Sequence, residues 1–218
     1  MKLYSYFRSS ASYRVRIALN LKGLAYDIVP VHLLRNGGEQ FSPEYRQLNP
    51  DALVPALVDD AIDSPIALTQ SLGIIEYLEE THPEPPLLPK DALDRAFVRG
   101  IALSIACDIH PINNLRVLRY LVRNLNVSED DKNAWYRHWC EQGLASIETT
   151  LARDPRVGKF CYGDTPTLAD CCLVPQVANA QRLNCDLTRM PTILRINETC
   201  LSLEAFAKAA PANQPDAE

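Results

Sequence analysis

The seven cysteines of this 218-residue chain include no C-x-x-C pair. No dithiol redox motif is therefore present. Their number is odd, and most of them lie among apolar residues. This pattern favours reduced, buried side chains in a cytoplasmic protein over the disulfide framework of a secreted one.

Several other signals are also missing. The four histidines show no metal-ligand spacing with one another or with cysteine, so we predict no metal site. The net charge of -5 gives no overall attraction to nucleic acid or to an acidic membrane surface. No apolar run approaches the ~20 residues that span a bilayer, and the N-terminus lacks the apolar core of a signal peptide. A small anionic substrate would therefore need a local cluster of arginines.

The order of predicted elements indicates two domains. The first eighty residues follow a βαβ-ββα pattern, which predicts a small mixed sheet with helices on both faces. Four prolines between residues 82 and 89 mark a linker. Only helical periodicity follows, up to Phe206. We therefore expect an α/β domain over residues 1–82, a linker over 83–89 and an all-helical domain over 90–218. The expected strands and helices of the first domain are Lys2–Phe7, Ser12–Lys22, Ala25–Val31, Pro43–Leu48, a strand opened by Pro55, Ile66–Leu68 and Ser71–Glu80.

Two sites in the helical domain carry clear local signals. Thr167 and Asp170 form a capping box at the start of a helix that runs to Arg182. Pro111 cannot continue the hydrogen-bond ladder, so we expect a kink within residues 91–124. The kink would leave His110, Asn114 and Arg116 near one opening. The polar, proline-containing segment 211–218 is predicted to be a mobile tail.

The turn at residues 8–12 is the strongest candidate for chemistry. Ser9, Ser10 and Ser12 stand where a short strand passes into an amphipathic helix. The start of a helix presents unpaired N–H groups and a partial positive charge. A serine there can cap the helix or stabilise a bound thiolate, and the sequence pattern alone favours the cap.

Longer stretches resemble one known family. Residues 4–19 read Tyr-Ser-Tyr-Phe-Arg-Ser-Ser-Ala-Ser-Tyr-Arg-Val-Arg-Ile-Ala-Leu, which resembles the signature of the zeta-class glutathione transferases, the family of maleylacetoacetate isomerase. Four further stretches match this family, and the resemblance covers nearly the whole chain. They are Leu48-Asn-Pro to Val54-Pro, Gln70-Ser-Leu to Glu80, Gly163-Asp to Asp170, and Val174-Pro-Gln-Val-Ala-Asn-Ala. Ala11 departs from the family, which usually has cysteine after the two serines.

The resemblance implies a thioredoxin-like N-terminal domain, an all-α C-terminal domain that contributes the substrate site, and glutathione as cofactor. It makes Ser9 the group that contacts the glutathione sulfur, and a helix N-terminus lowers a thiol pKa from ~8.5 to roughly 3.5–7.5. Because the serine is that contact, Ala11 is expected to alter side activities more than isomerisation. The cofactor-binding residues implied by the family are Ser9, Ser10, Gln40, Val54, Gln70, Ser71, Asp108, His110 and Asn114. The helix start at Gln70–Ser71 suits the γ-glutamyl carboxylate, and Val54, before the family's cis-proline, offers backbone groups.

The resemblance also implies the reaction, a cis–trans isomerisation of maleylacetoacetate or maleylpyruvate by thiolate addition, bond rotation and elimination. Arg8 and Arg182 are expected to be catalytic and, with Arg116 and His110, to bind a small dicarboxylate, since an arginine fork holds both carboxylate oxygens. Taken singly, each arginine is better explained as a surface charge or a partner of a helix end. The relatives imply a homodimer.

Two other functions remain open. The chain could be a general zeta-class transferase acting on small electrophiles or α-halo acids, which Ala11 leaves open. It could also be a non-catalytic binding module, although Ser9, Gln70 and Ser71 argue against this because such a module needs no thiolate site. Glutathione-dependent turnover, with or without thiol consumption, separates these functions.

Overall fold

The computed structural model describes residues 1–62 and 66–218, which form two compact units. The first unit comprises residues 1–87 together with 202–218, and the second comprises residues 88–201. The segment 202–218 therefore packs with the N-terminal part of the chain. None of the helices in the described residues is long and apolar enough to cross a membrane.

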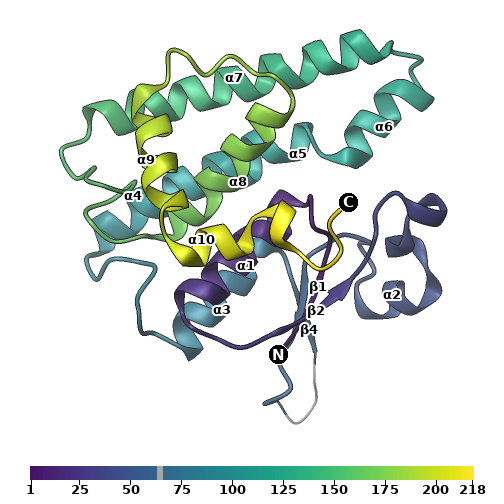
Figure 1. Ribbon diagram of the computed structural model, residues 1–218, viewed down its shortest axis with the longest axis horizontal. Helices are drawn as coiled ribbons and strands as arrows, with labels where there is room; N and C mark the ends of the chain where they lie inside the picture. Colours follow the sequence, from purple (N-terminus) through teal and green to yellow (C-terminus); the bar gives the residue numbers. More distant parts are fainter. Residues whose placement is uncertain (63–65) are drawn as a thin grey trace. The chain divides into compact units, whose positions relative to one another are not determined.

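The first unit is built on a four-stranded sheet of order β2-β1-β3-β4 (Figure 1). β1 pairs in parallel with β2, whereas β3 runs antiparallel to both β1 and β4. The predicted mixed sheet is confirmed. β1 and β2 are shorter than expected, and β1 ends at Ser5 because the chain enters a turn at Tyr6. The strands are β1 (Lys2–Ser5), β2 (Asp27–Pro30), β3 (Ala56–Val58) and β4 (Ala67–Thr69).

Helices cover both faces of this sheet. α1 packs against α3 and α10, and α2 lies on the opposite side (Figure 1). The middle of α1, from Ser12 to Leu19, is buried, so this helix forms the centre of the unit. The helices are α1 (Ser10–Leu21), α2 (Pro43–Leu48), α3 (Ser71–Thr81) and α10 (Glu204–Ala209).

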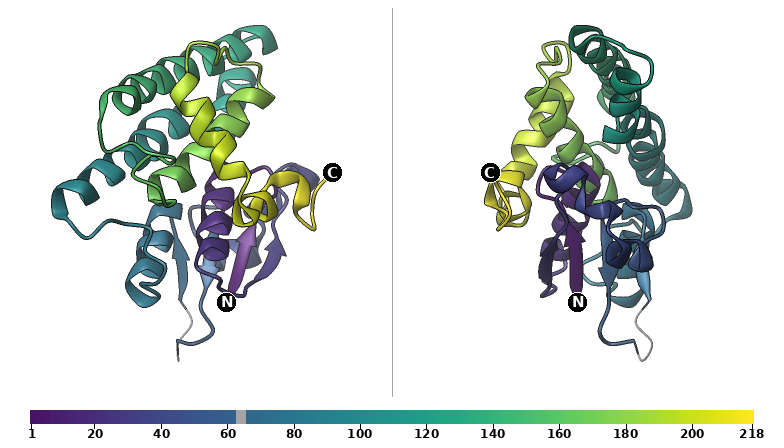
Figure 2. Two further views of the ribbon diagram at one scale, coloured as in Figure 1. Left: turned by 60° about the vertical axis from the view of Figure 1, so that its left-hand side comes forward. Right: turned by 90° about the vertical axis from the view of Figure 1, so that its right-hand side faces the viewer.

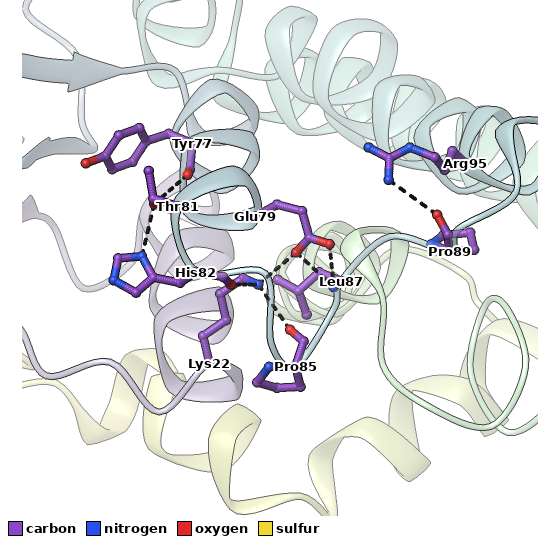
Figure 3. A network of polar contacts seen from close by, with 9 residues as sticks. All are labelled: Lys22, Tyr77, Glu79, Thr81, His82, Pro85, Leu87, Pro89 and Arg95. Atoms are coloured by element: carbon purple, nitrogen blue, oxygen red, sulfur yellow. Dashed lines mark hydrogen bonds and ion pairs between the residues drawn. The ribbon is translucent and has the colours of Figure 1, made fainter.

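A buried ion pair joins the end of α1 to α3. Lys22 Nζ lies 2.7 Å from Glu79 Oε2, and the two side chains are 0% and 10% exposed. The same ammonium donates to the carbonyls of His82 and Pro85, and the Glu79 carboxylate accepts the Leu87 N–H (Figure 3). The two charges therefore fix the course of the segment that follows α3.

The second unit is helical apart from one β-bridge between Val157 and Gly163. Its central helix is α8, whose residues are buried from Leu168 to Val177, with α9 beside it (Figure 2). The predicted capping box is present, with Asp170 accepting the Thr167 N–H at 2.8 Å. The helices are α4 (Ala92–Leu103), α5 (His110–Ile112), α6 (Leu115–Arg123), α7 (Glu129–Arg153), α8 (Leu168–Arg182) and α9 (Pro191–Leu201).

The kink expected at Pro111 takes a different form. Residues Ser104–Ile109 form a π-helical turn, in which the His110 N–H reaches back to the Ile105 carbonyl. The break between α5 and α6 follows at Asn113 and Asn114. A widened turn accommodates a proline because its missing N–H and its bulky ring disturb a regular α-helix.

The expectation of a mobile tail is wrong. Gln214 is buried and donates to the carbonyls of Lys208 and Ala210, at 2.8 and 2.9 Å. Asp216 accepts a hydrogen bond from the Phe7 N–H at 3.0 Å. Polar composition suggested mobility, but these contacts hold residues 214–216 against the first unit.

Acid should weaken the second unit through Asp154. Hydrogen bonds from Arg156 hold the pKa of Asp154 at about 2, below its usual 3.8. A depressed carboxyl pKa stabilises the fold above the unfolded value, and this contribution is lost as the pH falls from 3.8 to about 2. We expect Asp154→Asn to be less stable than wild type at neutral pH, and the difference to vanish at about pH 2. Urea unfolding of both proteins at several pH values measures this, and a constant difference would contradict it.

Candidate functional site

One end of the sheet gathers most of the predicted cofactor residues. Tyr4 in β1 lies opposite Ala56 in β3, and Ala56 lies opposite Thr69 in β4. β1 therefore ends, β3 begins and β4 ends at the same edge of the sheet. This edge therefore carries three features: the turn with Ser9 after β1, the Val54–Pro55 peptide before β3 and the start of α3 after β4.

Ser9 occupies the N-cap position of α1. Its Oγ accepts a hydrogen bond from the Ser12 N–H at 3.2 Å, which fixes the position of the half-buried hydroxyl. The hydroxyl proton remains free to be donated outward, because the cap uses only a lone pair of the oxygen. Capping and thiolate stabilisation are thus compatible in one side chain. The helix starts at Ser10, two residues earlier than expected, because Ser9 provides this cap.

The start of α3 presents a second helix N-terminus at the same edge. Gln70, at the N-cap position, makes no side-chain capping hydrogen bond within the described part of the chain. Its backbone has φ 66°, a conformation that L-residues rarely adopt and that often occurs at ligand sites. Ser71 is buried and its Oγ accepts a hydrogen bond from Arg14 Nη1 at 3.2 Å. The exposed Gln70 side chain and the first-turn N–H groups can therefore serve an anion.

Val54 and Gln40 complete the predicted set in the first unit. The Val54–Pro55 peptide is cis, as the resemblance implied. Gln40 lies in a 3₁₀ turn (Glu39–Phe41) after β2 and is 4% exposed. Its Oε1 is buried and has no hydrogen-bond partner among the described residues.

Arg8 lies directly before Ser9 and has an exposed side chain. Its guanidinium stacks on the ring of Phe7, 4.9 Å from the centroid. The cation is therefore held close to the serine turn while remaining accessible to solvent, which suits a group that binds an anion.

In the second unit, the π-helical turn leads into the predicted polar stretch. His110 is half-buried, and its Nε2 lies 3.4 Å from Asn114 Nδ2. Asn114 also caps α6, because its Oδ1 accepts the Arg116 N–H at 3.1 Å. The side chains of Asp108 and Arg116 are exposed. The structure thus brings His110 and Asn114 together and leaves the two charged groups in solvent.

Arg182 is the last residue of α8, and its side chain is exposed. Its Nη2 donates to Asn179 Oδ1 at 3.3 Å, one turn earlier on the same helix. Burial raises the pKa of Tyr136 in α7, while the Arg182 charge works in the opposite direction, which places the two groups within electrostatic reach. Tyr136 in turn accepts a hydrogen bond from the Asn113 side chain through its carbonyl. Arg182 and the polar stretch therefore both lie near this part of α7.

Comparison with known proteins identifies the family. Residues 3–86 match the glutathione S-transferase N-terminal domain family. A probable maleylacetoacetate isomerase of Vibrio cholerae is 52% identical over 99% of this chain and 97% of that protein. A solved holo structure of maleylpyruvate isomerase, a bacterial glutathione S-transferase of the zeta class, is 49% identical with a TM-score of 0.95 over 100% of both chains. The chain belongs to the zeta-class glutathione transferases.

A second solved relative shows which ligands such a fold takes. The maleylacetoacetate isomerase of Methylobacterium extorquens AM1, solved with bound malonate and glutathione, is 41% identical with a TM-score of 0.94 over 100% of both chains. The present protein therefore has the glutathione transferase fold predicted from its sequence. Among its described residues, no group of three His, Cys, Asp or Glu side chains is arranged to hold a metal ion.

The residues present in this zeta-class chain fit glutathione. Two helix N-termini meet at one sheet edge, and the unpartnered Gln40 oxygen lies in the loop that follows the neighbouring strand. Both helix ends favour a negative charge, which matches a thiolate at one and a carboxylate at the other.

Sequence reasoning missed the buried arginines beneath the site. Arg14 and Arg16 are 2% and 0% exposed, although a helix with one apolar face would place both in solvent. The available signal was their position inside the apolar run Tyr-Arg-Val-Arg-Ile-Ala-Leu, where every neighbour is buried. Long arginine side chains can satisfy backbone carbonyls in such a position.

Proposed function

We propose that the protein is a glutathione-dependent cis–trans isomerase that converts maleylacetoacetate, maleylpyruvate or both to the fumaryl form. The observation that carries this proposal is the position of Ser9. Its hydroxyl caps α1 at the edge of the sheet where α3 also begins. This arrangement provides a hydrogen-bond donor and a positive helix end for a sulfur anion.

The cofactor would be held through the first unit. We assign the γ-glutamyl carboxylate to Gln70, Ser71 and the first turn of α3, and the cysteinyl backbone to the main chain of Val54. Gln40 is assigned to the glycine carboxylate. Ser10, in the first turn of α1, and Asp108, His110 and Asn114, in the second unit, complete the proposed cofactor contacts.

When bound, glutathione supplies a thiolate that adds to the conjugated double bond and later leaves it. Ser9 donates its hydroxyl proton toward the sulfur and keeps it ionised. Arg8 and Arg182, together with Arg116, bind the two substrate carboxylates and stabilise the negative charge that develops on the substrate oxygen. His110 is assigned to the same substrate.

The proposal is tested with purified protein freed of thiols. We expect loss of maleylpyruvate and maleylacetoacetate only after glutathione is added, with the total thiol content unchanged. A full rate without thiol would overturn the proposal. Consumption of glutathione would instead indicate a general transferase acting on electrophiles or α-halo acids, and retention on a glutathione column without turnover would indicate a binding module.

Substitution of Arg182 by alanine should weaken substrate binding. A hydrogen-bonded ion pair contributes about 1.5–3 kcal/mol, so we expect the KM of the maleyl substrate to rise about 10-fold or more. The dissociation constant of glutathione should change much less, because it is assigned mainly to the first unit. Arg189→Ala, at an exposed arginine in the loop after α8, is the control. Equal weakening of both ligands would indicate a structural role for Arg182.

We further propose that the protein is a cytoplasmic homodimer. The seven cysteines, all of which lie among the described residues, form no disulfide bond, which supports a reducing compartment. The dimer is inferred from the resemblance to the zeta class. Light scattering on the purified protein tests the oligomeric state, and a monomer at micromolar concentration would contradict it.

A further inference from the structure

The catalytic turn is held by a segment more than two hundred residues away in the sequence. Asp216 Oδ2 accepts a hydrogen bond from the Phe7 N–H at 3.0 Å. The Phe7 carbonyl accepts a hydrogen bond from Arg16 Nη2, also at 3.0 Å. Both polar groups of the Phe7 backbone are therefore bound by side chains, two residues before Ser9.

Arg16 also binds the segments on either side of the Phe7 peptide. Its side chain is fully buried, and it donates from Nε to the Ala209 carbonyl at 2.9 Å and from Nη1 to Ser5 Oγ at 3.0 Å. Burial lowers the pKa of Arg16 to about 10, and the Asp216 charge is among the groups that oppose this shift. One guanidinium thus connects the end of β1, the serine turn and the end of α10.

The segment that carries Asp216 is itself anchored. Gln214 is buried, and its side-chain amide donates to the carbonyls of Lys208 in α10 and of Ala210 directly after it. Two residues beyond Asp216, Glu218 pairs with Arg35 and lies 3.5 Å from His32 Nε2. The carboxylate of Asp216 is therefore presented to Phe7 from a fixed backbone and not from a free end.

The Phe7 side chain also holds the turn between Phe7 and Ser9, because its buried ring packs edge-on against Tyr6, with 4.8 Å between the ring centroids. The Ser9 N–H bonds to the Tyr6 carbonyl at 2.9 Å, which closes the turn around Phe7 and Arg8. The Ser9 hydroxyl is directed by this turn and by its contact with the Ser12 N–H. A rotation of the Phe7 peptide would therefore be passed on to the hydroxyl that faces the sulfur.

We propose that Asp216 is a positioning residue for the isomerase reaction, which acts with Arg16 to fix the Phe7 peptide and, through it, the Ser9 hydroxyl. The inference rests on the proposed function for its catalytic consequence. Its structural half, the restraint of the Phe7 amide, does not depend on that function. Asp216 contacts neither substrate nor cofactor in this proposal.

The test compares Asp216→Ala with Asp216→Asn, which keeps an oxygen that can accept the Phe7 N–H. A displaced catalytic group costs up to about 100-fold in rate, and we expect Asp216→Ala to lower kcat about 10-fold. The pKa of the bound glutathione thiol, measured by thiolate absorbance, should rise, while the KM of the maleyl substrate should change less than kcat. Asp216→Asn should restore most of both values. Glu204→Gln, which removes an exposed carboxylate of α10, should match wild type.

Amide hydrogen exchange supplies a readout that does not need activity. We expect faster exchange at Phe7 in Asp216→Ala and near-normal exchange in Asp216→Asn, with unchanged circular dichroism in both. Unchanged exchange at Phe7 would overturn the proposal, as would an unchanged kcat and thiol pKa despite faster exchange. A wild-type protein without glutathione-dependent turnover would overturn the proposed function, and faster exchange in Asp216→Ala would still support the restraint of Phe7.

Discussion

Replacing Ser9 with alanine should lower the kcat of glutathione-dependent isomerisation by about 100-fold or more, roughly 2.7 kcal/mol of transition-state stabilisation, as for the loss of one preorganised donor. The hydroxyl is the only side-chain donor that we assign to the sulfur. Without it, the thiol pKa rises and less of the bound glutathione is ionised at neutral pH. Steady-state kinetics and thiolate absorbance measure the two effects on the same protein.

The alanine also removes the N-cap of α1, which costs about 1 kcal/mol of stability. Ser9→Thr separates the two roles, because threonine keeps the hydroxyl and the cap and should retain most of the rate. Ser12→Ala is the matched control, since Ser12 Oγ is buried without a hydrogen-bond partner among the described residues. An unimpaired rate in Ser9→Ala would mean that another group stabilises the sulfur.

Replacing Lys22 with methionine should destabilise the first unit by about 3–5 kcal/mol, because it leaves the Glu79 carboxylate buried and without its cation. The carbonyls of His82 and Pro85 lose their donor as well. Urea unfolding followed by circular dichroism measures the loss. Activity at low temperature should be affected much less, because neither residue belongs to the proposed site.

The double variant Lys22→Met/Glu79→Leu tests whether the unpaired charge is the cause. It should recover part of the lost stability, since two apolar side chains replace a lone buried charge. Recovery stays incomplete because the Leu87 N–H then lacks its acceptor. Lys208→Met, which breaks an exposed pair with Glu204, should change stability little. A double variant as unstable as Lys22→Met would show that the charge is not the cause.

Much of the fold could be predicted from short-range signals, whereas the glutathione-binding residues were inferred from the resemblance to the zeta class and stay a prediction. The capping box at Thr167 and the start of α3 at Ser71 depend on hydrogen bonds between residues three or four apart, which a sequence pattern records directly. The edge shared by Ser9, Val54 and Gln70 follows from strand order and register.

Contacts between distant segments left no such signal. Nothing in the composition of residues 211–218 indicates that Asp216 binds Phe7, 209 positions away along the chain. The burial of Arg14 and Arg16 likewise depends on α3 and α10 covering α1, which periodicity within α1 does not encode. Reasoning from local sequence therefore places in solvent those polar side chains whose partners lie far away along the chain.

The π-helical turn at Ser104–Ile109 determines the direction in which the polar stretch after it faces. A wider turn takes up one residue more than an α-helix needs. If the same residues wound as a regular α-helix, every following side chain would swing around the axis by about 100°, the angle per residue of an α-helix. His110 and Asn114 would then leave their present face together. The wider turn thus sets the rotation of the following residues about the helix axis. The number of residues in this turn therefore matters as well as their identity.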